Sequence, residues 1–285
     1  MPNKVIVLTD ATSGIGKALA VGLAKTGESV VIVAHDAEHG KLMMEEVRLA
    51  APDANVDLQL SDLSILSSVR NLAEILKSKY PAIDVLINNA SVHKRTRTVT
   101  IDGFEEMFAA NYLGPFLLTN LLLDPIQAAA QANGFARILN ITAPSDTPLN
   151  FDDLQSERDF KASNTFNAAR TAILLFTLEL ARQLESSGIT VNAIHSESMN
   201  EGFFLTRLFT RSSPENAAAS IVQAAVAPEF GNMTGKFLDE GNEVEVPAYT
   251  RDQDVQRRLW EISERLSGLA ATKGITPIND PHLEQ

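Results

Sequence analysis

The sequence contains no cysteine, which excludes disulfide bonds, thiol nucleophiles and thiolate metal ligands. It also lacks an apolar run near the roughly 20 residues that a membrane-spanning helix needs. The opening residues Met1-Pro2-Asn3 do not begin a charged and then apolar signal sequence. We therefore expect a cytoplasmic protein without a membrane span.

Positive charge is scarce. The chain has 24 lysines and arginines against 36 aspartates and glutamates, a formal net charge of -12. Such an acidic surface argues against binding to nucleic acid or to anionic membranes. We identify no metal site in the sequence. A small molecule is the expected partner.

What the sequence does contain is a regular alternation of strand and helix patterns. Short β-branched or apolar runs predict strands at 5–8, 29–34, 56–60, 83–87, 136–141, 190–194 and 236–238. Helical spacing predicts helices at 36–49, 64–79, 104–127, 164–186 and 252–266, and one opened by Pro214. The alternation predicts an α/β fold, a Rossmann-like doubly wound parallel sheet of about seven strands with helices on both faces. We expect one domain over 1–275 and a tail at 276–285.

Ligands of such sheets bind outside the carboxyl ends of the strands. The irregular, acidic stretch 142–163 is too long for a simple connection, so we expect it to cover a site. The stretch 196–214 has no clean periodicity and is interpreted as a lid.

The first strand runs into a small-residue turn with Gly14 and Gly16, and a helical pattern follows. Strand, glycine turn and helix is the order that places a pyrophosphate on a helix N-terminus. Asp10 stands where such a loop normally has a glycine. Aspartate tolerates unusual backbone conformations, so the turn itself is expected to survive.

Several stretches together resemble the short-chain dehydrogenases/reductases, and within them the retinol-dehydrogenase-like branch. They are TDATSGIG at 9–16, DLSILSSVR at 62–70, INNA at 87–90, DGFEEMFAANYLGPFLLTNLLL at 102–123, RILNIT at 137–142, ELARQL at 179–184 and RLWEISERLSGL at 258–269. The resemblance implies hydride transfer between NAD(P) and an alcohol or carbonyl. It also implies a catalytic tyrosine, a lysine four residues later, a serine on the fifth strand and an asparagine on the long helix.

This sequence keeps only one of those four groups. Asn111 matches the asparagine, whereas the serine becomes Ala143, the tyrosine Phe166 and the lysine Arg170. A phenyl ring has no proton to donate, and an arginine cannot act as a general base. Thr142 precedes Ala143 and, by strand alternation, would point the other way. We infer that this is not an ordinary dehydrogenase.

The same resemblance supplies candidate cofactor-binding residues: Thr9, Ser13, Gly14, Ile15, Gly16, His35, Asp62, Asn88, Ala90 and Arg170. Three residues oppose binding, because Asp10 and Glu197 add negative charge and Ser91 replaces a glycine. The end of the second strand has no acid for a ribose hydroxyl, and His35 leans toward NADP(H). Bound NADP(H) and no cofactor both remain open, since the glycines are also explained by close packing of helix and strand.

The candidate catalytic residues are Asn111, Arg170, His195 and Glu197, and the candidate pocket residues are His93, Thr142, Ala143 and Phe166. Each has a structural alternative. His195 stands where relatives commonly carry a histidine, Glu197 is explained by a solvated loop, and Asn111 by a tie between elements. His93, Lys94, Arg95 and Arg97 form a basic run that is either solvated or a guide for anionic substrates.

Three functions remain open. The first, which we favour, is a non-redox biosynthetic enzyme of isomerase, cyclase or pericyclase type that acts on an apolar small molecule. The second is an atypical NADP(H)-dependent oxidoreductase in which another residue supplies the proton. The third is a ligand-binding pseudoenzyme. The helices at 104–127 and 164–186 resemble those that pair in family dimers, so a homodimer is possible.

Overall fold

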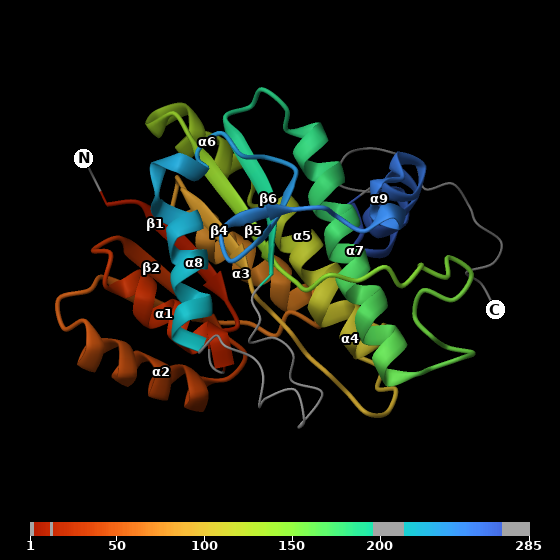
Figure 1. Cartoon of the computed structure of the whole chain (residues 1–285). Coiled ribbons are helices and arrows are strands. Elements are labelled where there is room, and N and C mark those ends of the chain that lie inside the picture. The colour runs from red at the N-terminus through yellow and green to blue at the C-terminus, as the bar shows by residue number, and fades with distance from the viewer. Residues whose placement is uncertain (1–2, 12–13, 196–213, 270–285) are drawn as a thin grey trace.

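The computed structural model describes residues 3–11, 14–195 and 214–269, and it places one sheet at the centre of the molecule (Figure 1). The eight strands of this part lie in the order β3-β2-β1-β4-β5-β6-β7-β8. They are β1 (Val5–Thr9), β2 (Ser29–Ala34), β3 (Val56–Leu60), β4 (Val85–Asn88), β5 (Ala136–Ile141), β6 (Ile189–His195), β7 (Lys236–Asp239) and β8 (Asn242–Val244). All neighbours pair in parallel except β7 and β8. The predicted doubly wound parallel sheet is confirmed. The antiparallel β8 was not predicted.

Helices cover both faces of the sheet. They are α1 (Gly14–Ala24), α2 (Ala37–Ala50), α3 (Leu66–Lys79), α4 (Glu106–Phe108), α5 (Gly114–Leu121), α6 (Leu123–Asn133), α7 (Ala162–Gln183), α8 (Pro214–Val226) and α9 (Gln253–Leu266). A π-helical turn, η1 (Ala109–Leu113), joins α4 to α5, and 3-10 turns lie at η4 (Pro228–Phe230) and η5 (Ala248–Arg251). None of the helices in the described residues is both long and apolar enough to cross a membrane.

Strand alternation divides the core between the two faces. Ile6 and Leu8 of β1 pack with α1, α2 and α8, whereas Val7 packs on the opposite face with α3, α5 and α7. This follows from the two-residue period of a strand, because successive side chains point to opposite faces. All three side chains are fully buried. The parallel sheet is therefore covered on both sides, as such sheets require.

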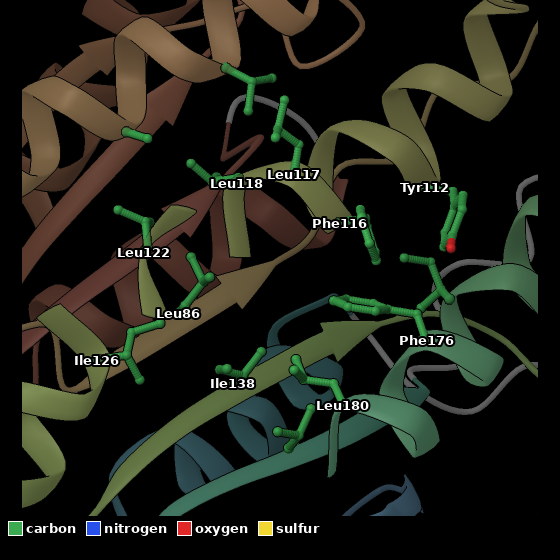
Figure 2. Packing of buried hydrophobic residues seen from close by; sticks show 14 of the residues in the cluster. Leu86, Tyr112, Phe116, Leu117, Leu118, Leu122, Ile126, Ile138, Phe176 and Leu180 are labelled. Atoms are coloured by element: carbon green, nitrogen blue, oxygen red, sulfur yellow. The ribbon is translucent and has the colours of Figure 1, made fainter. Parts of the chain in front are cut away.

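Aromatic rings fill the α5–α7–α9 side of the core (Figure 2). The Phe116 ring lies 5.0 Å from Trp260 and 5.3 Å from Phe176, both in edge-to-face arrangements. The Tyr112 hydroxyl lies 2.6 Å from the Ser263 hydroxyl, which ties η1 to α9. Trp260 is a core residue, because it is 7% exposed and its ring stacks on Phe176 of α7.

One long helix over 104–127 was a wrong prediction. The chain forms α4, the π turn η1, α5 and then α6, with a break at Leu122. Gly114 lies against the backbone of Leu63, where a Cβ atom would collide with the Leu63 carbonyl. The wider π turn η1 comes directly before this close contact between Gly114 and Leu63. Single π turns inside helices are frequent at functional sites, so η1 is a candidate part of the site.

Other expected elements fall close to their predicted bounds. Asp36 accepts hydrogen bonds from the backbone of Glu38 and His39 and so caps α2. The stretch 142–161 is irregular before α7 begins, as expected. The predicted lid at 196–214, apart from Pro214, lies outside the described residues, and so does the tail at 276–285. The homodimer stays a prediction.

Candidate functional site

After β1 the structure describes the chain on both sides of residues 12 and 13. Asp10 and Gly14 have positive φ angles of 50° and 52°. A Cβ on Gly16 would overlap the Asp10 carbonyl oxygen and lie 2.9 Å from Nδ2 of Asn89. Asn89 donates a hydrogen bond of 2.7 Å to that same carbonyl. Aspartate therefore occupies the left-handed position, and Gly16 allows helix, turn and strand to pack closely.

Two predicted cofactor residues use their side chains inside the sheet. The Thr9 hydroxyl accepts a 2.9 Å hydrogen bond from the Asn89 backbone. The Asn88 amide donates to the Thr119 hydroxyl at 2.9 Å and to Oδ1 of Asn140 at 2.8 Å, and it is 3% exposed. These side chains hold the ends of β1, β4 and β5 in register. Any contact with a cofactor would fall to their backbone atoms.

Of the remaining cofactor candidates, some are exposed on the surface and others are buried in the core. His35 is exposed, and its Nδ1 lies 3.8 Å from Oδ1 of Asp62, an oxygen that also accepts from the Ser64 backbone and hydroxyl. Ile15 is buried and packs into the core on the α1 face. Ala90 lines the cavity described next. Ser13 lies outside the described residues. Their roles toward a cofactor stay predictions.

A small cavity lies where β4 and β5 end against η1 and α7. Its empty space is about 260 Å³, a figure that includes open solvent. Its lining is formed by Ala90, Ser91, Asn111, Ile141, Thr142, Phe166, Ala169, Arg170 and Ile173. The structure thus brings together five of the predicted site residues: Ala90, Asn111, Thr142, Phe166 and Arg170. His93 and Ala143 do not line the cavity.

Phe166 and Arg170 form a stacked pair one helical turn apart on α7. The guanidinium carbon of Arg170 lies 4.3 Å from the centroid of the Phe166 ring, within cation–π distance. Burial lowers the pKa of Arg170, but arginine starts so high that it remains a cation at neutral pH. The cavity therefore has an apolar wall and one half-buried positive charge.

His93 reaches the same aromatic ring from the loop after β4. Its ring centroid lies 5.0 Å from that of Phe166, with the planes at 89°. His93 itself is exposed. His93, a predicted pocket residue, therefore lies against the Phe166 ring on the solvent side. It brings an ionisable group next to the position where the resemblance calls for a tyrosine.

Asn111 is engaged with the chain itself. Its Oδ1 accepts a 2.6 Å hydrogen bond from the Val92 backbone N–H, and its Nδ2 donates to the Val92 carbonyl at 2.8 Å. The residue is 8% exposed. Both functional groups of the amide thus fix the loop that carries His93. The structural alternative for Asn111, a tie between elements, describes these contacts.

Thr142 and Ala143 lie just beyond β5, which ends at Ile141. Thr142 lines the cavity, and its hydroxyl lies 3.5 Å from the Arg170 carbonyl. Ala143 is 3% exposed and is not part of the lining. Thr142 is therefore at the cavity, as expected of a pocket residue, with its hydroxyl engaged by the backbone of α7.

His195 ends β6 beside Asp239 of β7. Its Nδ1 lies 3.1 Å from Oδ1 of Asp239, and the two residues are register partners. The imidazole is 8% exposed, and its Nε2 has no hydrogen-bond partner in the described part of the chain. The pair joins two strand ends, which agrees with the structural alternative. Glu197 lies outside the described residues.

The basic run after β4 is largely paired with acidic or carbonyl groups. Lys94 lies 2.8 Å from Glu106, and Arg97 donates to the Gln155 carbonyl and lies 3.9 Å from Glu157. These pairs leave less positive charge for guiding anionic substrates than the sequence suggested. Across residues 3–11, 14–195 and 214–269, no group of three histidine or acidic residues could hold a metal ion.

Sequence reasoning missed Glu105. Its carboxylate caps α4 by accepting from the Phe108 backbone at 2.7 Å, yet the residue is fully buried. Its backbone N–H donates to the side chain of Gln155 in the loop before α7. Burial raises the pKa of Glu105 above its ordinary value. An acid directly before a helical pattern was the available signal, because acids favour helix N-termini.

Comparison with known proteins agrees with this architecture. Residues 4–207 match the family described as short chain dehydrogenase. The chain is 35% identical to Retinol dehydrogenase 13 of Mus musculus, with 96% of this chain and 86% of that protein covered. It is 32% identical to Polyprenol dehydrogenase of Homo sapiens, with coverages of 94% and 86%.

Solved structures share the fold. An uncharacterised protein from Mycobacterium paratuberculosis has a TM-score of 0.75 and 27% identity, covering 94% of this chain and 96% of its own. A metagenomic short-chain oxidoreductase in complex with NADP has a TM-score of 0.62 and 21% identity, with coverages of 87% and 98%. The resemblance seen in the sequence is thereby confirmed: the chain belongs to the short-chain dehydrogenase/reductase family, in its retinol-dehydrogenase-like branch.

Proposed function

We propose that this protein is an enzyme that carries out a non-redox change, an isomerisation or a cyclisation, on an apolar small molecule. The observation that carries the proposal is the Phe166–Arg170 stack in the cavity. Where relatives of this family have a proton-donating tyrosine and a lysine, this chain presents a phenyl ring and a permanent cation. Neither can complete the proton transfer that accompanies hydride transfer to a carbonyl.

The residues present fit the pyrophosphate and adenosine part of a dinucleotide better than its nicotinamide end. The left-handed turn at Asp10 and Gly14 and the start of α1 suit a pyrophosphate, although Asp10 adds a negative charge there. His35 and Asp62 would hold the adenosine end. A bound NADP(H) would supply a hydride, but a partner proton from the family's tyrosine position is missing. NADP(H) could then serve as a structural part of the pocket.

The cavity supports an apolar ligand with one polar group. Ala90, Ile141, Phe166, Ala169 and Ile173 supply its apolar surface, and Arg170 supplies the charge. Such a pocket lowers a barrier by holding a reactive conformation and by stabilising negative charge that develops on one oxygen. Both effects favour isomerisation or ring closure, and neither needs an external reductant.

The second candidate is an atypical NADP(H)-dependent oxidoreductase. The retained turn around Gly16 and the approach of His93 to Phe166 favour it, because they offer a cofactor loop and an ionisable group. The relatives named retinol dehydrogenase and polyprenol dehydrogenase also favour it. Under this alternative, His93 would supply the proton that accompanies hydride transfer, because Phe166 has none to give.

One experiment separates these candidates. The purified protein is incubated with a library of apolar ketones and polyenes, with and without NADPH, and products are identified by mass spectrometry. The non-redox function predicts products of unchanged mass, formed without NADPH consumption. A gain of two hydrogens with NADPH loss would establish the oxidoreductase instead. NADPH binding by calorimetry without any turnover would indicate a pseudoenzyme. Ser91→Trp, which fills the cavity from an exposed lining position, should abolish conversion in either case.

A further inference from the structure

We propose that His93 is the proton donor and acceptor of this pocket and that the substrate class is an apolar, enolisable ketone. The assignment deepens the proposed function, since it names the group that moves the proton and the compound on which it acts. It begins from the contact between the His93 and Phe166 rings, 5.0 Å apart and perpendicular.

The first step in the argument is position. Phe166 lines the cavity, and His93, which is not among the lining residues, contacts the Phe166 ring from the loop after β4. Imidazole is the side chain best suited to exchange protons near neutral pH. Of the rings and cations that contact Phe166 in the described chain, His93 is the one with this chemistry, because Arg170 cannot give up its proton.

The second step is anchoring. A catalytic group on a loop needs its backbone fixed, and Asn111 provides this through two hydrogen bonds to the adjacent Val92. The π turn η1 carries Asn111 to that position. On the other side of His93, Lys94 is held by Glu106 at 2.8 Å. His93 therefore lies between two anchored residues.

The third step is proton supply. A buried acid needs a relay to regain its proton, whereas His93 is exposed and can exchange directly with water. The residues that would form a relay here are engaged or unsuitable: Asn111 is bound to Val92, and Arg170 remains protonated. An exposed imidazole at the edge of an apolar pocket removes the need for such a relay.

The charged surroundings of His93 complete the site. Arg170 of α7 stacks on the Phe166 ring, which is the ring that His93 contacts. On the loop, Lys94 is paired with Glu106 of α4, and Arg97 with Glu157. Arg95 is exposed. Arg170 is thus the cation that lines the cavity and can face a ketone oxygen.

The proton transfer balances without an oxidant or reductant. Neutral His93 takes a proton from the carbon next to the carbonyl. The electron pair of that C–H bond forms a carbon–carbon double bond, and the carbonyl pair moves to oxygen beside Arg170. The imidazolium then returns the proton to the far end of the conjugated system, which restores the carbonyl and shifts the double bond.

The test uses cyclohex-3-en-1-one, a small β,γ-unsaturated ketone, and follows its conversion to the conjugated isomer by ultraviolet absorbance. The wild-type protein should accelerate conversion, and His93→Gln should lower the enzyme-dependent rate by roughly 10²- to 10⁴-fold, the usual contribution of general acid–base catalysis. His39→Gln is the matched control, because His39 is another exposed histidine whose ring is bonded to Asp36 on α2. It should retain the wild-type rate and pH profile, and added imidazole should partly restore the His93→Gly variant.

Two results would overturn the assignment: unchanged conversion in His93→Gln, or no conversion by the wild-type protein up to the solubility limit of the ketone. A failure of the proposed function would look different. If NADPH is consumed and the ketone is reduced, the non-redox function is wrong. The His93 assignment then stands if His93→Gln loses that reduction, and it is overturned if the variant keeps it.

Discussion

The Arg170 guanidinium carbon lies 4.3 Å from the centroid of the Phe166 ring, so this cation and this phenyl group stabilise each other. A cation–π contact of this kind contributes about 0.5–2 kcal/mol, more as water is excluded. The two positions are therefore coupled. Substituting Phe166 alone leaves the half-buried charge of Arg170 without its aromatic partner. Substituting Arg170 alone leaves the Phe166 ring without the cation that stacks on it.

This coupling leads to the first prediction. The triple variant Ala143→Ser, Phe166→Tyr, Arg170→Lys should reduce an apolar ketone with NADPH at least ~10²-fold faster than the wild-type protein, because it introduces a positioned proton donor. The measurement is the loss of NADPH absorbance. Phe166→Tyr alone is the control and should gain far less, since its hydroxyl lacks a neighbouring ammonium. Equal reduction by the wild-type protein would contradict the prediction.

The second prediction concerns the crowded turn after β1. Gly16→Ala should lower the free energy of unfolding by about 1–3 kcal/mol, as overpacking does, because its Cβ would overlap the Asp10 carbonyl oxygen. Urea unfolding measures the effect. Gly22→Ala on the same helix is the control: its Cβ would meet only the Val222 side chain at 3.0 Å. That variant gains helix propensity, so equal losses in both variants would refute the explanation.

The third prediction tests the anchor. Asn111→Ala should destabilise the fold by about 1–3 kcal/mol, because the Val92 N–H and carbonyl lose their partners. Faster amide exchange at Val92 is the specific readout. Asn120→Ala is the matched control, since that side chain makes one hydrogen bond, to the Phe116 carbonyl one turn away. An unchanged exchange rate at Val92 would show that the loop is held by other contacts.

The fourth prediction is a pH dependence at Glu105. Burial raises its pKa in the folded state, so the folded protein keeps the proton over a range in which the unfolded chain has lost it. The free energy of unfolding contributed by Glu105 therefore falls as pH rises from the ordinary glutamate pKa to the raised folded pKa. The difference between wild type and Glu105→Gln, from urea unfolding at several pH values, should show this slope.

Glu106 is the matched control of opposite sign. Burial raises its pKa, but hydrogen bonds from Lys94 and Thr98 outweigh that effect and lower it overall. Its contribution to stability is therefore lost as pH falls through the lowered folded pKa. Slopes of the same sign for Glu105→Gln and Glu106→Gln would contradict the assignment of these two environments.

The sequence predicted the sheet well because its signals are local. The β-branched run at 29–34 and the spacing of apolar residues along 64–79 need no knowledge of distant residues, and β2 and α3 lie there. The helix at 104–127 failed for the opposite reason. Its interruption depends on how Gly114 meets Leu63, a contact between segments far apart in the chain.

The candidate site divides in the same way. Phe166 and Arg170 were expected in one pocket from their spacing and the family pattern, and they line one cavity. The hydrogen bonds of Asn111 to Val92, and the role of Glu105 as a buried cap, arise from tertiary packing. Thr142 faces the cavity because β5 ends one residue earlier, and strand bounds cannot be read from sequence to a single residue.

The hydrogen bonds that join Asn88 to Thr119 and Asn140, and Asn140 to Thr177, run beneath the cavity without using any residue that lines it. The polar contacts that align the sheet are thus separate from the residues that line the cavity. A lineage, or a laboratory, can exchange the side chains at 143, 166 and 170 while the scaffold keeps its shape. Under the proposed non-redox function, this separation is a physical route by which a redox fold acquires a different reaction class.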